Sequence, residues 1–211
     1  MEKSVEYLKQ EIERKYAVNY LPKDLKIIDI LEIEQAFIYR DINTVIRIRK
    51  IHNRKKNYLE CIYTVKTKGD IEYDKNFEKV AHIYEIENSI QEDEYNELIE
   101  NKISNVIKKT RIIIPIEDNL NVEMDIYYGY LEGLLTAEVE FPSEDIANAF
   151  QRPKWLGEEI GYKELSNLSL SKMTKEEWQS KVTKETIENN RKIILDLKEN
   201  DKIWKVLILK I

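Results

Sequence analysis

A short run near the N-terminus, Glu11-Ile12-Glu13-Arg14-Lys15, combines residue types that can bind metal and phosphate. In a β-strand, successive side chains point to opposite faces, so Glu11, Glu13 and Lys15 would share one face. In a helix, Glu13 would lie roughly opposite Glu11, and no joint site would form. Two carboxylates beside an ammonium suit a divalent cation next to an anion, because hard cations take oxygen ligands and lysine neutralises phosphate charge. A solvated strand edge of alternating charge is the alternative.

The same spacing of two recurs along the segments that must position these residues. Alternation and turn residues predict strands over residues 11–15, 30–39, 44–50, 58–66, 77–87, 106–114, 122–128 and 134–141, and helices over 91–101, 144–150 and, with a break, 174–200. A loop is expected over 68–74, an irregular stretch over 155–170, and a strand or short helix over 203–211. Charged side chains lie in phase on seven of these strands, and the opposite faces are apolar, as at Val122, Met124 and Ile126. The in-phase set has six cations, Lys15, Arg47, Arg49, Lys66, Lys109 and Arg111, and eight carboxylates, Glu11, Glu13, Glu85, Glu87, Glu123, Asp125, Glu138 and Glu140.

Two arrangements could accommodate these charged faces. A sandwich would expose them to bulk water, whereas a closed barrel with helices on its outside would turn them into a charged lumen. The charges are segregated by strand, since some strands carry only cations and others only carboxylates, and ordinary cross-strand pairing on a surface gives no reason for that. Neighbouring glutamates repel each other unless a metal neutralises them, so we expect a lumen that binds metal on one wall and a polyanion on another.

The composition excludes several classes of protein. The chain has 211 residues, of which 42% are hydrophobic and 35% charged, with a net charge of −6 that argues against general binding to nucleic acid or anionic membranes. Two histidines are too few for a zinc site, and the five glycines form no phosphate-binding loop. With one cysteine, no signal region and no apolar run of transmembrane length, we expect a cytoplasmic protein, monomeric or homodimeric.

A series of motifs resembles a known family. The run at residues 11–15 is similar to the ExExK signature of CYTH domains, the triphosphate tunnel metalloenzymes. Further matches follow in the same order at 46–49, 63–66, 84–87, 108–111, 129–134, 137–141 and 155–157. The ExExK signature alone is weak, but the ordered series is specific and covers roughly residues 8 to 171. We therefore expect a CYTH-like tunnel domain over residues 1–171 and a C-terminal helical extension, 172–211, packed on the same domain.

The resemblance implies an α+β fold: a closed eight-stranded antiparallel β-barrel, or tunnel, with helices packed on the outside. It implies Mg²⁺ or Mn²⁺ as cofactor, with Glu138 and Glu140 as ligands of a first metal. Glu11 and Glu13 would hold a second metal and orient the attacking water. The phosphate-binding residues would be Lys15, next to the hydrolysed phosphoryl group, and Arg47, Arg49, Lys66, Lys109 and Arg111. Supporting roles would fall to Glu85, Glu87, Glu123 and Asp125.

The implied activity is metal-dependent hydrolysis of a triphosphate-containing small molecule, with inorganic tripolyphosphate as the expected substrate. Alternatives within the same fold are a nucleoside or thiamine triphosphatase and a class IV adenylyl cyclase, which need a pocket for an organic group. Tyr58, Tyr63 and Tyr127 are the candidates for stacking one. A polyphosphate-binding module without turnover and a structural barrel with solvated charges are the non-enzymatic alternatives. The chain also departs from the family in its late aromatic-Ser-Asn motif, which reads Leu165-Ser166-Asn167 here.

Overall fold

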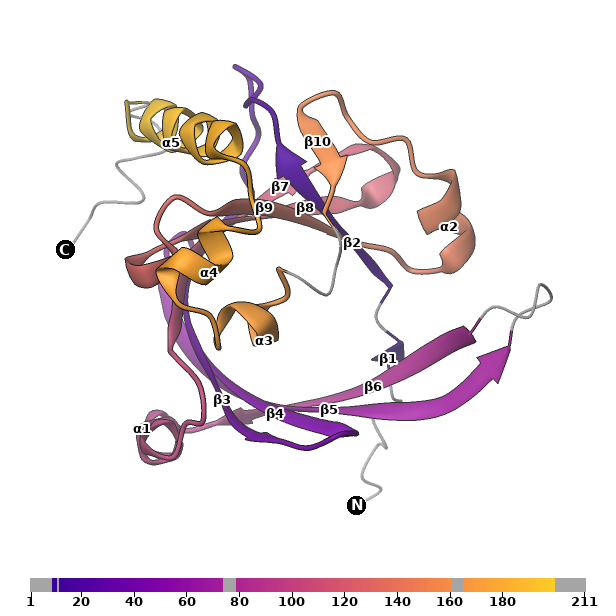
Figure 1. Ribbon diagram of the computed structural model, residues 1–211, viewed down its shortest axis with the longest axis vertical. Helices are drawn as coiled ribbons and strands as arrows, with labels where there is room; N and C mark the ends of the chain where they lie inside the picture. The colour runs from indigo at the N-terminus through magenta and orange to yellow at the C-terminus, as the bar shows by residue number, and fades with distance from the viewer. Residues whose placement is uncertain (1–8, 11, 74–78, 161–164, 200–211) are drawn as a thin grey trace.

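A single antiparallel sheet dominates the protein (Figure 1). The computed structural model describes residues 9–10, 12–73, 79–160 and 165–199. Ten strands pair in the order β1-β6-β5-β4-β3-β7-β8-β9-β2-β10. Their bounds are β1 Lys9–Gln10, β2 Glu13–Val18, β3 Asp29–Arg40, β4 Thr44–Asn53, β5 Tyr58–Tyr73, β6 Lys79–Ile90, β7 Ile107–Pro115, β8 Asn121–Tyr127, β9 Leu135–Glu140 and β10 Leu156–Glu159.

Short helices connect and cover the strands. They are α1 Glu92–Glu100, α2 Glu144–Ala149, α3 Asn167–Leu170, α4 Lys175–Gln179 and α5 Lys184–Glu199, with single 3-10 turns η1 Glu117–Asn119 and η2 Gly129–Leu131. The helix predicted over 174–200 is two helices, α4 and α5, and Thr174 caps α4 through a capping box as its sequence indicates. The segment 68–73, expected as a loop, extends β5. No helix in the described ranges is long and apolar enough to cross a membrane.

The prediction of a closed eight-stranded barrel is wrong, because the described residues form an open sheet of ten strands. The sheet curves so that β4, β5 and β6 lie across from β2, β8 and β9 (Figure 1). The N-terminal segment pairs with strands from both halves of the sheet, because β1 pairs with β6 and β2 pairs with β9. The other edge of β2 pairs with β10, at Leu156↔Val18 and Glu159↔Tyr16. Because β10 occupies this edge of β2 at Tyr16 and Val18, that part of the strand is not available to β6, and the described strands do not form a closed ring.

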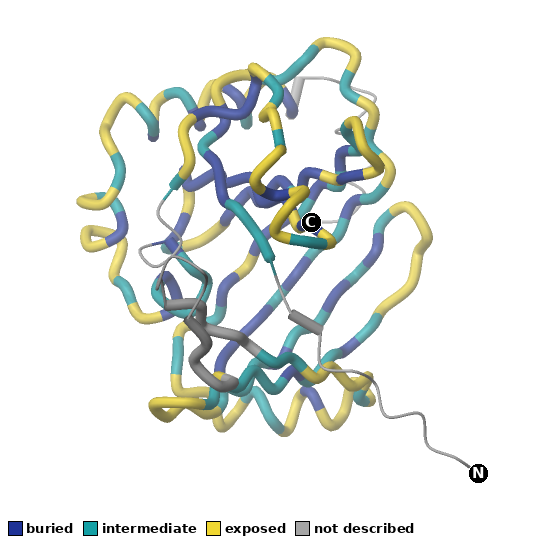
Figure 2. Tube along the Cα trace, turned by 90° about the vertical axis from the view of Figure 1, so that its right-hand side faces the viewer, coloured by how far each residue is buried: buried dark blue, intermediate teal, exposed yellow. Residues whose placement is uncertain are grey.

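The apolar face of β8 and β9 packs away from the charged face. Val122, Met124 and Val139 are fully buried there, in one cluster with Ala147 of α2 and Ile193 of α5. Buried residues follow the strands, and exposed residues follow the connections (Figure 2). Because side chains alternate along a strand, this packing fixes the charged residues of β8 and β9 on the opposite, concave face.

The C-terminal helices share apolar clusters with the sheet. Trp178 of α4 has no exposed side-chain surface and packs with Leu131 and Leu134, and its Nε1 donates a hydrogen bond to the carbonyl oxygen of Tyr130 at 2.7 Å. Ile193 and Leu197 of α5 join the cluster on the back of β8 and β9. The predicted division at residue 171 stays a prediction, and the segment 203–211, expected as a strand or short helix, lies outside the described residues.

Candidate active site

The concave face of the sheet surrounds a cavity of about 700 Å³. Its walls come from β2 to β7 and β9, and the start of α3 adds Ser166, Asn167 and Leu168. Most of the residues singled out in the sequence line it: Glu13, Lys15, Arg47, Arg49, Lys66, Glu85, Glu87, Lys109, Arg111, Glu138 and Glu140. Glu123 and Asp125 are not among the lining residues, but both pair with Arg111, which is. Glu11 lies outside the described residues.

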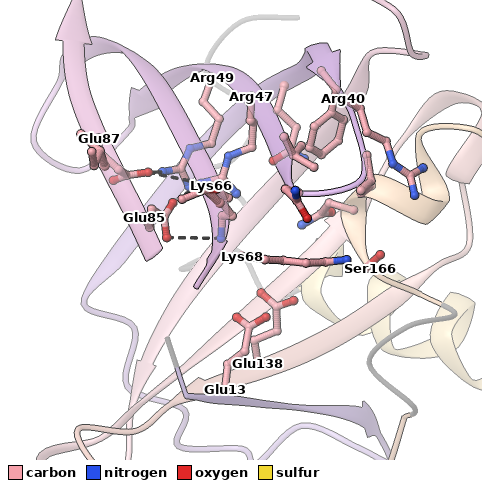
Figure 3. A pocket seen from close by; sticks show the side chains of 18 of the residues that line it. Glu13, Arg40, Arg47, Arg49, Lys66, Lys68, Glu85, Glu87, Glu138 and Ser166 are labelled. Carbon is pink, nitrogen blue, oxygen red and sulfur yellow. Dashed lines mark hydrogen bonds and ion pairs between the residues drawn. The ribbon is translucent and has the colours of Figure 1, made fainter. Parts of the chain in front are cut away.

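The wall formed by β4, β5 and β6 presents arginines and a lysine held by two glutamates (Figure 3). Arg47 donates to Glu85 at 3.0 Å and to Glu87 at 3.2 Å, and Arg49 also pairs with Glu87. Lys66 Nζ lies 3.2 Å from Glu85. Burial and the neighbouring Arg47 lower the pKa of Arg49 to about 10. At neutral pH Arg49 therefore keeps its charge, and the two glutamates hold the cations of this wall in place.

The opposite wall, formed by β7, β8, β9 and β2, is a deeper ion-pair network. Glu138 accepts from Lys15 at 2.7 Å and from Arg111 at 2.8 Å. Asp125, whose side chain is wholly buried, accepts from Arg111 at 2.7 Å and from Lys109 at 2.6 Å. Burial would raise the pKa of Glu138, but Lys15 and Arg111 outweigh burial and hold it far below its ordinary value. The cations on this wall are therefore fixed in place by carboxylates that stay ionised.

This network corrects one expectation from the sequence. The glutamates on β9 were expected to repel one another unless metal neutralised them. Glu138 is instead neutralised by protein cations, because the strand register places Lys15 directly opposite it on β2. Two like-charged pairs lie directly opposite each other across neighbouring strands: Glu123 with Glu138, which share Arg111 as a partner, and Glu13 with Glu140. Like charges in that position are unfavourable unless something positive lies between or beside them.

The carboxylates that line the cavity are candidate ligands for a divalent metal. Among the described residues, no group of three or more His, Cys, Asp or Glu side chains is arranged to hold a metal ion. Mg²⁺ does not need such a cage, since it is usually bound by one or two carboxylates together with substrate phosphates and water. Glu13 and Glu140, which are in register and line the cavity, supply the right oxygen ligands together with Glu138. Glu13 and Glu138 lie side by side in Figure 3. The residues present therefore fit a metal that binds together with its anionic substrate.

Several lining residues were missed because they are not part of a charged pair at spacing two. Arg40 ends β3, Lys68 lies further along β5 than the predicted strand, and Gln35 is neutral. The Leu165-Ser166-Asn167 segment was noted only as a departure from the family, yet it also reaches the cavity. The carbonyl oxygen of Leu165 accepts from Lys15 Nζ at 2.9 Å, and Ser166 caps α3.

The alternative functions, a nucleoside or thiamine triphosphatase and an adenylyl cyclase, need a pocket that binds an organic group. Tyr58, Tyr63 and Tyr127 were the candidate stacking residues, and none of them lines the cavity. Tyr127 is buried, and its hydroxyl donates to Asn167 Oδ1 at 3.1 Å. In the described part of the chain, Phe37 is the only aromatic residue among those lining the cavity. The site is therefore built for charge more than for stacking.

Comparison with known proteins gives the same family as the motifs. The chain is 44% identical over 54 residues to an inorganic triphosphatase from Nitrosomonas europaea, covering 26% of this chain and only 36% of that relative. It is 31% identical over 127 residues to an inorganic triphosphatase from Acetivibrio thermocellus, covering 60% of this chain and 70% of that one. No protein-family model matches.

A solved structure extends the likeness to the fold. The crystal structure of an inorganic triphosphatase superposes with a TM-score of 0.53 at 27% identity, covering 78% of this chain and 96% of that chain. The second of the two sequence alignments runs through most of its relative, and the structural match covers nearly all of the solved chain. Together with the ordered motifs around one charged cavity, these similarities show that the chain belongs to the CYTH family, the triphosphate tunnel metalloenzymes.

Proposed function

We propose that this protein hydrolyses inorganic tripolyphosphate to pyrophosphate and phosphate, with Mg²⁺ or Mn²⁺ as cofactor. The observation that carries the proposal is the cavity itself, in which six basic side chains from four strands meet around a space of about 700 Å³: Lys15, Arg47, Arg49, Lys66, Lys109 and Arg111. A compact polyanion is the ligand that uses all of them. The near absence of aromatic lining favours a substrate without an organic group over the nucleotide and thiamine alternatives.

The positioning of the substrate follows from the two walls. Arg47 and Arg49 present planar guanidinium groups that suit paired phosphate oxygens, and Lys66 adds a point charge beside them. Across the cavity, Lys15, Lys109 and Arg111 neutralise the charge that develops on the phosphoryl group under attack. All of these cations are held by carboxylates before substrate arrives, so little reorganisation accompanies binding. We assign the holding role to Glu85, Glu87, Glu123 and Asp125.

The hydrolytic step needs a water molecule in line with the leaving pyrophosphate. A divalent cation held by Glu13, Glu138 and Glu140 would neutralise phosphate oxygens and make a bound water more acidic. No histidine is among the described residues that line the cavity, so a carboxylate of β2 or β9 is the acceptor for the proton that the water loses. The water oxygen bonds to the terminal phosphorus, the bridging P–O bond breaks, and pyrophosphate leaves. Glu11, outside the described residues, keeps its sequence-based assignment to this step.

The test is a substrate panel read by released phosphate: tripolyphosphate, ATP and thiamine triphosphate, each with Mg²⁺ or Mn²⁺. Tripolyphosphate should be hydrolysed fastest. Lys109→Met should lose at least ~10²-fold in activity, the scale for one well-placed electrostatic stabiliser. Lys108→Met is the matched control, because Lys108 is the next residue on β7, is exposed and pairs with Glu34 at 2.6 Å. Binding of tripolyphosphate without phosphate release would make the protein a polyphosphate-binding module, and cyclic nucleotide formation from ATP would make it a cyclase.

A further inference from the structure

Gln35 is a buried polar residue on the cavity wall to which the mechanism above gives no role. It lies in β3, and its side chain lines the cavity although only 1% of the residue is exposed. Its side-chain nitrogen, Nε2, is buried and has no hydrogen-bond partner in the described part of the chain. A side chain that can donate two hydrogen bonds is thus held out of bulk water with nothing to receive them.

Such a group is uncommon in folded proteins and calls for an explanation. Buried polar atoms are hydrogen-bonded in the large majority of cases, because an unsatisfied donor loses its water without gaining a partner. An apolar residue of similar size would fill this position on β3 without that penalty. The residues on either side of Gln35 on the same face of β3, Ile33 and Phe37, are apolar and buried. The amide is therefore explained best by a ligand that enters the cavity.

The adjacent strand, β4, carries two further buried donors that have no hydrogen-bond partner among the described residues. Gln35 and Arg49 are direct register partners between β3 and β4. The Nε atoms of Arg47 and Arg49 are buried without a hydrogen-bond partner among the described residues, although the terminal nitrogens of both arginines contact Glu85 or Glu87. Three N–H donors on two neighbouring strands thus lack acceptors on the wall of one cavity. A ligand rich in closely spaced acceptor oxygens satisfies all three.

We propose that Gln35 is a substrate-binding residue whose amide donates a hydrogen bond to a non-transferred phosphate oxygen of tripolyphosphate. The inference rests on the proposed function and adds a neutral hydrogen-bond donor to the basic residues that bind the substrate. Arg47 and Arg49 lie across the cavity from Glu13 and Glu138, which belong to the wall assigned to metal and to the attacked phosphoryl group (Figure 3). Gln35, next to Arg49, therefore contacts the part of the substrate that leaves as pyrophosphate.

The location predicts which kinetic constant changes. An interaction made equally in the ground state and the transition state changes KM and leaves kcat nearly unchanged. Gln35→Met keeps the length of the side chain but removes the donor, and should weaken tripolyphosphate binding about tenfold, the scale of one hydrogen bond to a charged group. Gln35→Glu puts a carboxylate where the anion binds and should weaken binding more. Tyr95→Phe is the matched control, because Tyr95 also has a buried hydroxyl without a partner in the described structure, in a cluster beneath α1 away from the cavity.

The experiment measures three quantities on the full chain. They are calorimetric binding of tripolyphosphate in EDTA, steady-state kinetics with Mg²⁺, and the melting temperature with and without tripolyphosphate. We expect Gln35→Met to keep or raise the melting temperature of the free protein, to show a smaller ligand-induced rise, and to raise KM far more than it lowers kcat. Tyr95→Phe should leave KM unchanged.

The remaining outcomes overturn the inference in distinguishable ways. If the wild type binds and hydrolyses tripolyphosphate and Gln35→Met does so with the same constants, Gln35 makes no contact and only this inference fails. A fall in the melting temperature of free Gln35→Met, with unchanged substrate binding, assigns the residue a structural role instead. If the wild type neither binds nor hydrolyses tripolyphosphate, the proposed function fails and this inference fails with it.

Discussion

Lys15 and Glu138 face each other as direct register partners on β2 and β9, with Lys15 Nζ 2.7 Å from a carboxylate oxygen of Glu138. The other carboxylate oxygen accepts from Arg111 at 2.8 Å. Both Lys15 and Glu138 are almost completely buried. Glu138 therefore links the cation expected next to the hydrolysed phosphoryl group to the network around Asp125, so it supports the structure of the site as well as its charge.

The first prediction is that Glu138→Gln destabilises the free protein. The change leaves Lys15 and Arg111 buried with less negative charge between them, and breaking a buried ion pair costs about 3 kcal/mol or more. Glu140→Gln, on the same strand but exposed, should shift the unfolding free energy by no more than about 0.5 kcal/mol. Urea unfolding of the three proteins without metal measures both changes. An unchanged or higher stability of Glu138→Gln would show that repulsion among carboxylates dominates this wall.

The second prediction compares two arginines on opposite walls of the cavity, Arg111 on β7 and Arg49 on β4. Arg111 holds Asp125, whose side chain is wholly buried, so Arg111→Met should lower stability by about 3 kcal/mol as well as weaken binding. Arg49 pairs with Glu87, which is 40% exposed and keeps Arg47 as a partner, so Arg49→Met should cost about 1 kcal/mol or less. Both variants should bind tripolyphosphate at least about tenfold more weakly. Equal melting temperatures for the two variants would contradict the difference in burial.

The third prediction concerns pH and Lys109. Burial and the neighbouring Arg111 lower its pKa to about 8, although Asp125 and Glu138 favour the charged form. Above pH 8 the free protein therefore loses a proton from Lys109, while a bound polyanion favours keeping it. Tripolyphosphate binding should weaken as pH rises from 7 to 9, with proton uptake at the upper end.

Comparison of the wild type with Lys109→Met isolates the contribution of Lys109 to proton uptake, because tripolyphosphate itself titrates in the same way with both proteins. The variant should bind more weakly at pH 7 and should take up fewer protons at pH 9 than the wild type. Calorimetry in two buffers of different ionisation enthalpy, with EDTA present, measures the difference. Identical proton uptake by both proteins would mean that Lys109 keeps its charge throughout.

The phase of the strands could be read from the sequence, and the closure of the sheet could not. Alternation at Val122, Met124 and Ile126 was enough to place Glu123 and Asp125 on the opposite face, because a packed apolar face fixes every side chain of its strand. Whether β2 closes a barrel depends on which strand takes its second edge. That strand is β10, only four residues long at Leu156–Glu159, in a stretch whose sequence was read as irregular.

Contacts within the site were predictable only where they join direct neighbours in the sheet. Lys15 and Glu138 meet across one strand pair, and the spacing of two on each strand had placed both on the charged face. Arg47 reaches Glu85 and Glu87 on β6, over the intervening β5. Gln35 was placed on one strand face with Leu31, Ile33 and Phe37 but given no role, because a neutral amide among apolar residues gives no pattern, and its significance lies in an unsatisfied nitrogen that only coordinates reveal.

The last prediction concerns metal and the register pair Glu13 and Glu140. Two carboxylates directly opposite each other should bind Mg²⁺ or Mn²⁺ most strongly when tripolyphosphate supplies further oxygen ligands. A ligand that binds only the folded state stabilises it by about 2.7 kcal/mol at a hundred times its Kd, which raises the melting temperature of a chain of this size by roughly 5–10 °C. Mg²⁺ and tripolyphosphate together should therefore raise the melting temperature of the wild type more than the sum of their separate effects.

Glu13→Gln and Glu140→Gln should each lose that cooperative rise and retain the smaller rise from tripolyphosphate alone, since the basic wall is intact in both. Glu117→Gln, an exposed substitution in η1 between β7 and β8, is the matched control and should behave as the wild type. Activity should disappear on exhaustive chelation, and Ca²⁺ should inhibit, because its larger and looser coordination shell misplaces the phosphate oxygens. A cooperative rise of equal size in Glu13→Gln, Glu140→Gln and the control would show that Glu13 and Glu140 do not bind the metal, whatever the activity measurements gave.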